Sequence, residues 1–282
     1  MITMKGDAVS AKLKEQVEKG LETLTWVPKL TIIRVGENPD DISYEKGATK
    51  KLTSFGLEVE SKVFPGDISD EAFKKEFAAI NADASVDGIL MLRPLPKQIN
   101  EQDIEKMIDP AKDLDGISPV NIAKVFSGDT SGFAPCTAEA VVCMLKMNDI
   151  ALSGKRVAVV GRSMVVGRPL SMLLLHENAT VTICHSRTAN LPEVCREADI
   201  LTACVGKAAM INHTYVKKDA VVIDVGINVD ENGKLCGDVD FADLDASAAT
   251  PVPGGVGGVT TAVLAQHLVR AARMKQEKNS NK

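Results

Sequence analysis

The sequence lacks the charge and hydrophobicity patterns of several protein classes. Its 33 lysines and arginines are outnumbered by 38 aspartates and glutamates, a formal net charge of −5, so we expect no polybasic surface for nucleic acid. No stretch approaches the ~20 apolar residues that a membrane-spanning helix needs. The amino-terminal lysines are not followed by the apolar core segment of a secretory signal. These absences predict a cytoplasmic protein that binds neither nucleic acid nor membranes.

Metal-binding and disulfide patterns are missing as well. The six cysteines include no C-x-x-C pair, and the chain is too long to depend on disulfides for its stability. The four histidines have no spacing typical of metal ligands. We therefore expect reduced, mostly buried thiols and no metal site.

The composition is that of a folded protein with two domains. Hydrophobic residues make up 45% and charged residues 25% of the 282 positions. At roughly 100–200 residues per domain, this length favours two domains over one very large domain. Apolar runs rich in β-branched residues alternate with amphipathic helical stretches, which predicts an α/β fold with a mainly parallel sheet in each half.

The pattern predicts strands at 30–35, 57–64, 86–92, 156–160, 180–184, 200–205 and 221–225. It predicts helices at 7–24, 40–55, 69–82, 136–148, 167–177 and 190–197, and a last helix after 261. The polar tail 274–282 is expected to fray. Segment 93–118 has three prolines and many acids, and we interpret it as a cleft wall that leads to a domain boundary.

The strongest local signal is a glycine turn between a strand and a helix at 155–169. The turn places backbone N–H groups at a helix start, where they can bind a phosphate. It differs from G-x-G-x-x-G, because Ser163 takes the second glycine position and one extra residue precedes Gly167. A tight turn without a ligand is the alternative.

The end of the next strand indicates which dinucleotide binds. An NAD site usually has an acid here for the ribose hydroxyls, whereas residues 182–188 contain none. Arg187 and Arg162 supply positive charge and Ser186 a donor for a ribose 2′-phosphate, which favours NADP and leaves NAD possible. Solvated surface arginines are the alternative.

Two further stretches suit a flat ligand. Residues 225–228 end a strand, where open α/β sheets bind their ligands. Residues 251–258 carry four glycines within five positions, which allow the backbone to approach a ring closely. A flexible loop without a ligand would explain either stretch alone.

These motifs together resemble the methylenetetrahydrofolate dehydrogenase/cyclohydrolase family over nearly the whole chain. The matches are GENP with Tyr44 (36–44), DGIL with PLP (87–96), KDLDGISPVN (112–121), PCT (135–137), GRSMVVGRP (161–169), CHSRT (184–188), DVGIN (224–228) and TPVPGGVG (250–257). The resemblance implies a substrate domain of residues 1–119 completed by a helix at 262–278, and a Rossmann-like NADP-binding domain of residues 120–261. It also implies a cytoplasmic homodimer of one-carbon metabolism with tetrahydrofolate held against NADP.

The resemblance also implies roles for individual residues. Asp115 matches the family's folate-binding acid, whose carboxylate can accept from the amine and ring N–H of a pterin. Tyr44 matches an aromatic residue placed against the folate, and both residues are predicted to be catalytic. A helix-capping Asp115 and a core Tyr44 are the alternatives. The other substrate positions are Pro94, Leu95, Pro96, Pro253, Gly254 and Gly255. The cofactor positions are Gly161, Arg162, Ser163, Val166, Gly167, Ser186, Arg187 and Ile227.

The chain departs from the family pattern at two positions. Ala48 stands where most relatives have a lysine one helical turn after the tyrosine, and Leu92 stands where they have a glutamine. Hydride transfer needs positioning rather than an acid or base, whereas cyclohydrolysis adds water and moves protons. We therefore expect an NADP-dependent dehydrogenase whose cyclohydrolase activity is weak or absent, unless Lys46 or Arg93 replaces the lysine. The alternatives are the full bifunctional enzyme, a folate- and NADP-binding protein without turnover, and an unrelated two-domain α/β dehydrogenase.

Overall fold

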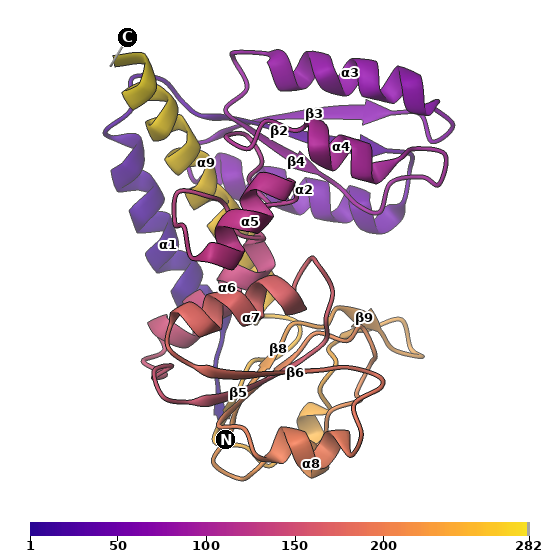
Figure 1. The fold of residues 1–282 in the computed structure, drawn as a ribbon, viewed down its shortest axis with the longest axis vertical. Helices are drawn as coiled ribbons and strands as arrows, with labels where there is room; N and C mark the ends of the chain where they lie inside the picture. Colours follow the sequence, from indigo (N-terminus) through magenta and orange to yellow (C-terminus); the bar gives the residue numbers. More distant parts are fainter. Residues whose placement is uncertain (281–282) are drawn as a thin grey trace. The chain divides into compact units, whose positions relative to one another are not determined.

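The computed structural model describes residues 1–280, which form two compact α/β units (Figure 1). Unit 1 comprises residues 1–12 and 135–260, and unit 2 comprises residues 13–134 and, within the described part of the chain, 261–280. Each unit contains its own parallel sheet. The predicted two-domain α/β fold is therefore confirmed.

Unit 2 is built on a three-stranded parallel sheet with the order β3-β2-β4. Its strands are β2 (Lys29–Val35), β3 (Glu58–Phe64) and β4 (Gly88–Met91), and its connecting helices are α2 (Pro39–Ser54) and α3 (Asp70–Ala82). Asn38 and Ser69 accept the first helical N–H groups of these helices. The connections leave β2 and β3 in opposite directions along the sheet, so right-handed crossovers place α2 and α3 on opposite faces (Figure 1).

Further helices complete unit 2. Helices α4 (Glu101–Met107) and α5 (Pro119–Ser127) lie within it, while α1 (Gly6–Leu21) and the carboxyl-terminal α9 (Val256–Ser280) each begin in unit 1 and continue in unit 2. The pattern at 93–118 did not predict α4. The expectation that the tail frays is wrong for residues 274–280, because α9 continues to Ser280; residues 281–282 lie outside the described part.

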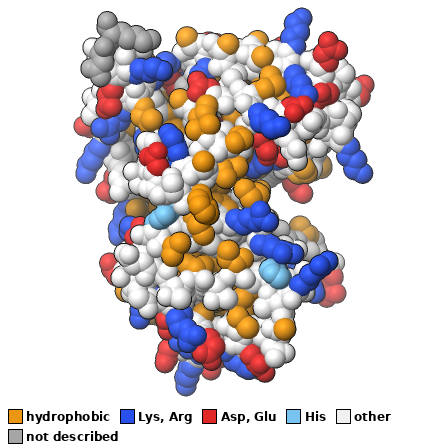
Figure 2. Space-filling view, viewed as in Figure 1, with side chains coloured by type: hydrophobic (Ala, Val, Ile, Leu, Met, Phe, Trp, Pro, Cys, Tyr) orange, Lys and Arg blue, Asp and Glu red, His pale blue; other side chains and the backbone are white. Residues whose placement is uncertain are grey.

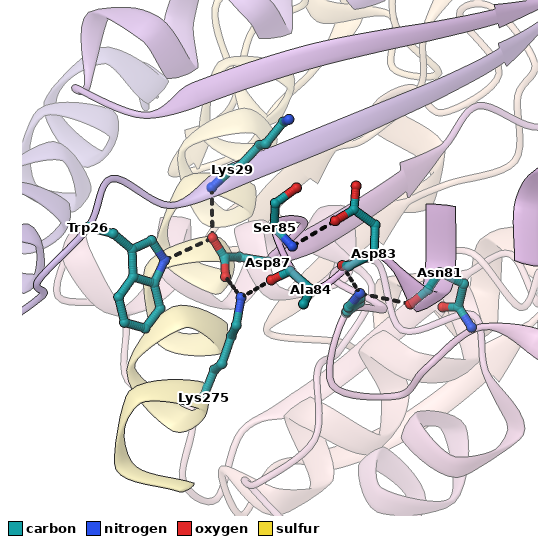
Figure 3. A network of polar contacts seen from close by, with 9 residues as sticks. Trp26, Lys29, Asn81, Asp83, Ala84, Ser85, Asp87 and Lys275 are labelled. Carbon is teal, nitrogen blue, oxygen red and sulfur yellow. Dashed lines mark hydrogen bonds and ion pairs between the residues drawn. The ribbon is translucent and has the colours of Figure 1, made fainter. Parts of the chain in front are cut away.

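The carboxyl-terminal half of α9 is tied to the sheet by a buried acid (Figure 3). Asp87, which immediately precedes β4, accepts from Lys275 Nζ at 2.6 Å, from Trp26 Nε1 at 3.0 Å and from the Lys29 backbone at 3.0 Å. Lys275 also donates to the Ala84 carbonyl at 2.6 Å. These bonds compensate the burial of the carboxylate and explain why the polar tail remains helical.

Unit 1 contains a six-stranded parallel sheet with the order β1-β11-β8-β7-β5-β6. Its strands are β1 (Ile2–Thr3), β5 (Arg156–Val160), β6 (Thr180–Cys184), β7 (Ile200–Ala203), β8 (Val221–Asp224) and β11 (Ala248–Ala249). Its helices are α6 (Cys136–Met147), α7 (Gly167–His176) and α8 (Leu191–Arg196), with short 3-10 helices at His213–Tyr215 and Phe241–Asp243. A two-stranded antiparallel hairpin joins β9 (Asn228–Val229) to β10 (Leu235–Cys236). The strand order reverses between β5 and β7, which creates the crevice where such sheets bind ligands.

The unit boundaries differ from the predicted ones. Asn121 donates to Asp113 at 2.9 Å and accepts from the Phe133 backbone, and Arg270 of α9 donates to the Gly132 carbonyl. These bonds hold residues 120–134 in unit 2, so the division falls after Ala134 rather than at 119. Residues 1–12 belong to unit 1 because β1 pairs with β11, a contact too short to be visible in the sequence pattern.

The structure of residues 1–280 can be compared with the classes of protein that the composition excludes. The six cysteines form no disulfide with one another, and Cys136, Cys184 and Cys195 are buried. No described helix is long and apolar enough to cross a membrane. Both acidic and basic side chains lie on the face shown in Figure 2. Within residues 1–280, no group of three or more histidine, cysteine, aspartate or glutamate side chains could hold a metal ion.

Candidate functional site

The glycine turn of unit 1 lies at the carboxyl end of β5, beside the crevice. Gly161 has a φ of 137°, and a Cβ there would lie 2.3 Å from the Cys204 carbonyl oxygen. A Cβ on Gly167, the first residue of α7, would lie 2.2 Å from the Gly161 carbonyl oxygen. Val166, the residue before the helix, provides no side-chain cap. The Arg168 N–H donates to the Ser163 carbonyl at 3.0 Å, and Pro169 has no N–H, so the Gly167 N–H is the group at the start of α7 that can bind a phosphate.

The next strand end brings the predicted charged residues to the same edge of the sheet. β6 pairs with β5 in parallel, and the Gly161 N–H donates to the Cys184 carbonyl at 2.9 Å. In the turn that follows, the His185 N–H donates to Thr188 Oγ1 and the Arg187 N–H to His185 Nδ1. Arg187 is exposed there.

Ser186, Arg162 and Ser163 are exposed as well. Ser163 also accepts from the Val166 N–H at 3.1 Å, which shapes the glycine turn. The edge therefore presents two arginines and serine hydroxyls without a carboxylate in the turn, which suits a ribose 2′-phosphate.

The loops after β7 and β8 form the other part of this edge. Ile227 is 70% exposed, as a residue that contacts a flat ring would be. Two buried acids that the sequence pattern did not indicate as site residues, Asp224 and Asp238, hold these loops. Burial raises the pKa of Asp224 to about 6. The sequence signal was the G-D-V-D run at 237–240, which resembles a surface turn until its contacts are known.

The glycine-rich stretch before α9 packs against the amino-terminal segment of unit 1. The Gly6 N–H donates to the Gly254 carbonyl at 2.8 Å, and a Cβ on Gly255 would lie 2.4 Å from the Pro251 carbonyl oxygen. Gly254 has a φ of 95°. The positive φ of Gly254 and the close packing of Gly255 thus explain these two glycines without a ligand. Pro253 and Gly254 remain exposed.

In unit 2, the predicted folate tyrosine lies on the surface of α2. Tyr44 is 39% exposed, so it is not the core residue of the alternative reading. Ala48 is 2% exposed and faces the interior of unit 2. The helix runs without interruption from Pro39 to Ser54, and Lys46 is exposed about 200° around the helix from Tyr44. Its position does not bring it beside the tyrosine.

The second proposed substitute for the lysine is engaged elsewhere in unit 2. Arg93 Nη1 lies 3.3 Å from Glu101 Oε1 and 3.3 Å from Glu105 Oε1, both on α4. Burial raises the pKa of Glu105. Leu92 before it is buried.

The PLP segment follows directly. Pro94 is exposed, Leu95 is buried and Pro96 is half-buried. The Leu95 N–H donates to Glu101 Oε2 at 3.0 Å, so the same glutamate that pairs with Arg93 also fixes this segment.

The KDLDG motif assigns different tasks to its residues. Lys112 donates to the Asn81 and Asp83 carbonyls at 2.7 and 2.6 Å, and burial lowers its pKa. Asp113 accepts from the backbone of Ile117 and Ser118 at 2.9 and 2.8 Å.

The helix after the motif begins with a different cap from the one considered for Asp115. Ser118 is the N-cap of α5, because its hydroxyl accepts from the Asn121 N–H. The helix-capping alternative for Asp115 is therefore wrong. Asp115 is half-buried in the segment that Lys112 and Asp113 hold in place.

Together, these features define a class: a two-unit α/β enzyme in which one unit has the glycine turn and crevice of a dinucleotide-binding fold. Comparison with known proteins makes this specific. Residues 135–276 match the family described as "Tetrahydrofolate dehydrogenase/cyclohydrolase, NAD(P)-binding domain", and residues 4–115 match its "catalytic domain". The chain belongs to the tetrahydrofolate dehydrogenase/cyclohydrolase family.

Individual relatives agree with this membership. The "Bifunctional protein FolD" of Clostridioides difficile is 52% identical over 280 residues, covering 98% of both chains. The crystal structure of the bifunctional methylenetetrahydrofolate dehydrogenase/cyclohydrolase from Campylobacter jejuni superposes with a TM-score of 0.94 at 36% identity, covering 98% of this chain and 99% of that one. The Trypanosoma brucei enzyme, solved with NADP and an inhibitor, gives a TM-score of 0.90 at 30% identity, covering 98% of both. The resemblance found in the sequence is confirmed at the level of the family.

Proposed function

We propose that this protein is a bifunctional enzyme of one-carbon metabolism. It oxidises 5,10-methylenetetrahydrofolate to the methenyl form with NADP and then hydrolyses the methenyl product. The observation that carries this proposal is the match to the family in both units, at 52% identity to a relative named as bifunctional. The names of the relatives favour this reading over the loss of the cyclohydrolase step.

The predicted residues of unit 1 bind the dinucleotide. The Gly167 N–H at the start of α7 binds the pyrophosphate, and Gly161 and Val166 shape the turn that exposes it. Ile227 contacts the cofactor from the loop after β8. Arg162, Ser163, Ser186 and Arg187 bind the 2′-phosphate and adjoining ribose. When bound, NADP supplies the acceptor for the hydride.

In unit 2, Asp115 accepts hydrogen bonds from the pterin, and Tyr44 packs against the folate. Pro94, Leu95 and Pro96 contact the folate in unit 2. Pro253, Gly254 and Gly255 of unit 1 remain predicted substrate-binding positions. Unit 2 accordingly acts as the substrate domain. A cytoplasmic homodimer remains our prediction for the assembly.

A second candidate is a dehydrogenase with little cyclohydrolase activity. It is favoured by the buried Ala48, the buried Leu92 and the pairing of Arg93 with two glutamates, because none of these side chains offers a free amine for proton transfer. Oxidation of the methylene group needs no such amine, since orientation of the two rings does most of the work.

One preparation distinguishes the two candidates. NADP reduction and methenyl hydrolysis are measured separately on the purified protein. If methenyltetrahydrofolate accumulates and is hydrolysed only at the uncatalysed rate, the result supports the dehydrogenase alone. Hydrolysis that is faster when the enzyme is present supports the bifunctional enzyme. If neither reaction is catalysed although NADP binds, the non-catalytic alternative replaces both.

A further inference from the structure

Three successive backbone N–H groups in the loop after β7 converge on one buried carboxylate. Asp238 accepts from Val205 N at 2.6 Å, Gly206 N at 3.1 Å and Lys207 N at 2.8 Å. It also accepts at 3.0 Å from Asn228 Nδ2, at the start of β9, where the loop after β8 ends. A single side chain therefore ties together the two loops that follow neighbouring strands of unit 1.

A second acid holds Asp238 in place. Asp224, the last residue of β8, accepts from Gly226 N at 3.0 Å, from Asp238 N at 2.9 Å and from Val239 N at 3.0 Å. The segments that carry the two acids thus hold each other. Asp224 accepts from the backbone of Asp238 and Val239, and Asp238 accepts from the side chain of Asn228, which follows Asp224 in the chain. We call Asp224 and Asp238 the carboxylate brace.

Two glycines of the sequence motifs are required by the carboxylate brace. A Cβ on Gly226 would lie 2.3 Å from Asp238 Cγ, and a Cβ on Gly237 would lie 1.8 Å from Asp224 Oδ2. The D-V-G-I-N and G-D-V-D runs therefore pack against each other and form a single structural unit, rather than a ligand loop and an unrelated turn.

The carboxylate brace touches only one side of the dinucleotide crevice. The loop at 205–207 follows β7, which borders the crevice opposite β5, and the loop at 226–228 with the exposed Ile227 follows β8. The arginine and serine positions for the 2′-phosphate lie at the ends of β5 and β6 instead, where neither brace residue makes a hydrogen bond. A dinucleotide that crosses the crevice places its nicotinamide half on the side of β7 and β8.

We propose that Asp238 is a positioning residue for the nicotinamide half of the cofactor, because its carboxylate fixes the backbone of both loops that face this half. This inference rests on the proposed function and deepens it. The carboxylate offers four acceptor positions to four donors, so the amide of Asp238→Asn loses acceptors and turns N–H groups toward backbone N–H groups. The loops then lose their fixed geometry, while the glycine turn and the 2′-phosphate residues keep theirs.

The test uses two ligands on the full-length protein. Isothermal titration measures the binding of NADP and of 2′,5′-ADP, which contains only the adenosine half with its 2′-phosphate. For Asp238→Asn we expect NADP binding to weaken by about tenfold and 2′,5′-ADP binding to stay within about twofold of the wild type. The kcat of hydride transfer falls as well, while the KM for methylenetetrahydrofolate stays unchanged.

The matched control is Asp230→Asn. Asp230 also accepts two backbone N–H groups, from Asn232 and Lys234, but in the exposed turn of the β9–β10 hairpin. It should leave the affinities for both ligands unchanged. Circular dichroism compares the folding of the variants. If Asp238→Asn does not fold, Asn228→Ala removes one donor only and should show the same pattern with a smaller loss.

The outcomes separate this inference from the proposed function. Equal weakening of both ligands would show a general structural role and overturn the inference, as would unchanged NADP binding. A wild-type protein that binds neither NADP nor 2′,5′-ADP would instead overturn the proposed function, and with it this inference.

Discussion

Burial of Asp224 should give unit 1 an unusual dependence of stability on pH. The side chain is 3% exposed, and its pKa is raised from 3.8 to about 6 because burial disfavours the charged form. The folded state therefore holds a proton more tightly than the unfolded state. The penalty for the charged carboxylate is fully present above pH 6 and is relieved as the pH falls through 6 toward 4.

The size of this effect follows from the two pKa values. One pKa unit corresponds to about 1.4 kcal/mol, so the full penalty at neutral pH is about 3 kcal/mol, of which about 2 kcal/mol is relieved at pH 4.5. Most other perturbed carboxylates act in the opposite direction. Glu45, Glu60 and Asp199 have lowered pKa values, so protonating them in acid destabilises the protein.

The comparison that isolates Asp224 is the wild type against Asp224→Asn. Urea unfolding is followed by circular dichroism between pH 4.5 and pH 7.5, and fluorescence of Trp26 reports unit 2 separately. The free energy of unfolding of the wild type should gain about 2 kcal/mol relative to the variant on going from pH 7 to pH 4.5. A difference that stays constant with pH, or a relative gain for the variant in acid, would refute the reasoning.

Three further predictions concern the cofactor edge and the α9 anchor. Arg162→Ala should weaken NADP binding by about tenfold and NAD binding by less than twofold, because only NADP has a 2′-phosphate; titration with both cofactors checks this, and an unchanged ratio would remove the assignment. Gly167→Ala should abolish detectable NADP binding, since its Cβ would lie 2.2 Å from the Gly161 carbonyl oxygen; normal binding by this variant would contradict the turn geometry. Lys275→Met should destabilise unit 2 by about 2 kcal/mol and change the fluorescence of Trp26, because Asp87 stays buried without its cation. The exposed Lys278→Met serves as the control, and an equal effect of both changes would argue against the ion pair as the cause.

The sequence predicted most of the fold because the central strands are buried on both faces. Runs such as 30–35 and 156–160 are mostly apolar, and the structure places β2 and β5 there within one residue. The strands β1 and β11 were not predicted, because two-residue strands carry no periodic signal and depend on a partner far away in the chain. The boundary at Ala134 was missed for a similar reason, since the bonds of Asn121 and Arg270 that define it are long-range.

Some parts of the candidate site could likewise be predicted from the sequence, and other parts could not. The glycine turn and the arginine positions could be predicted because their geometry is local: a strand end, a turn and a helix start. The carboxylate brace could not, because Asp238 acts on residues more than thirty positions away and its own surroundings resemble a polar turn. The orientation of Arg93 toward α4 likewise depends on a neighbouring helix whose position the pattern did not give.

The pairing of β1 with β11 has a consequence for the synthesis of the chain. Ile2 and its partner Ala248 are separated by 248 − 2 = 246 positions in the sequence. The outermost ladder of this sheet therefore cannot close until all of the chain between them has been synthesised. Until then, the segment that carries β1 has no partner strand, so this ladder is a late step in the folding of unit 1.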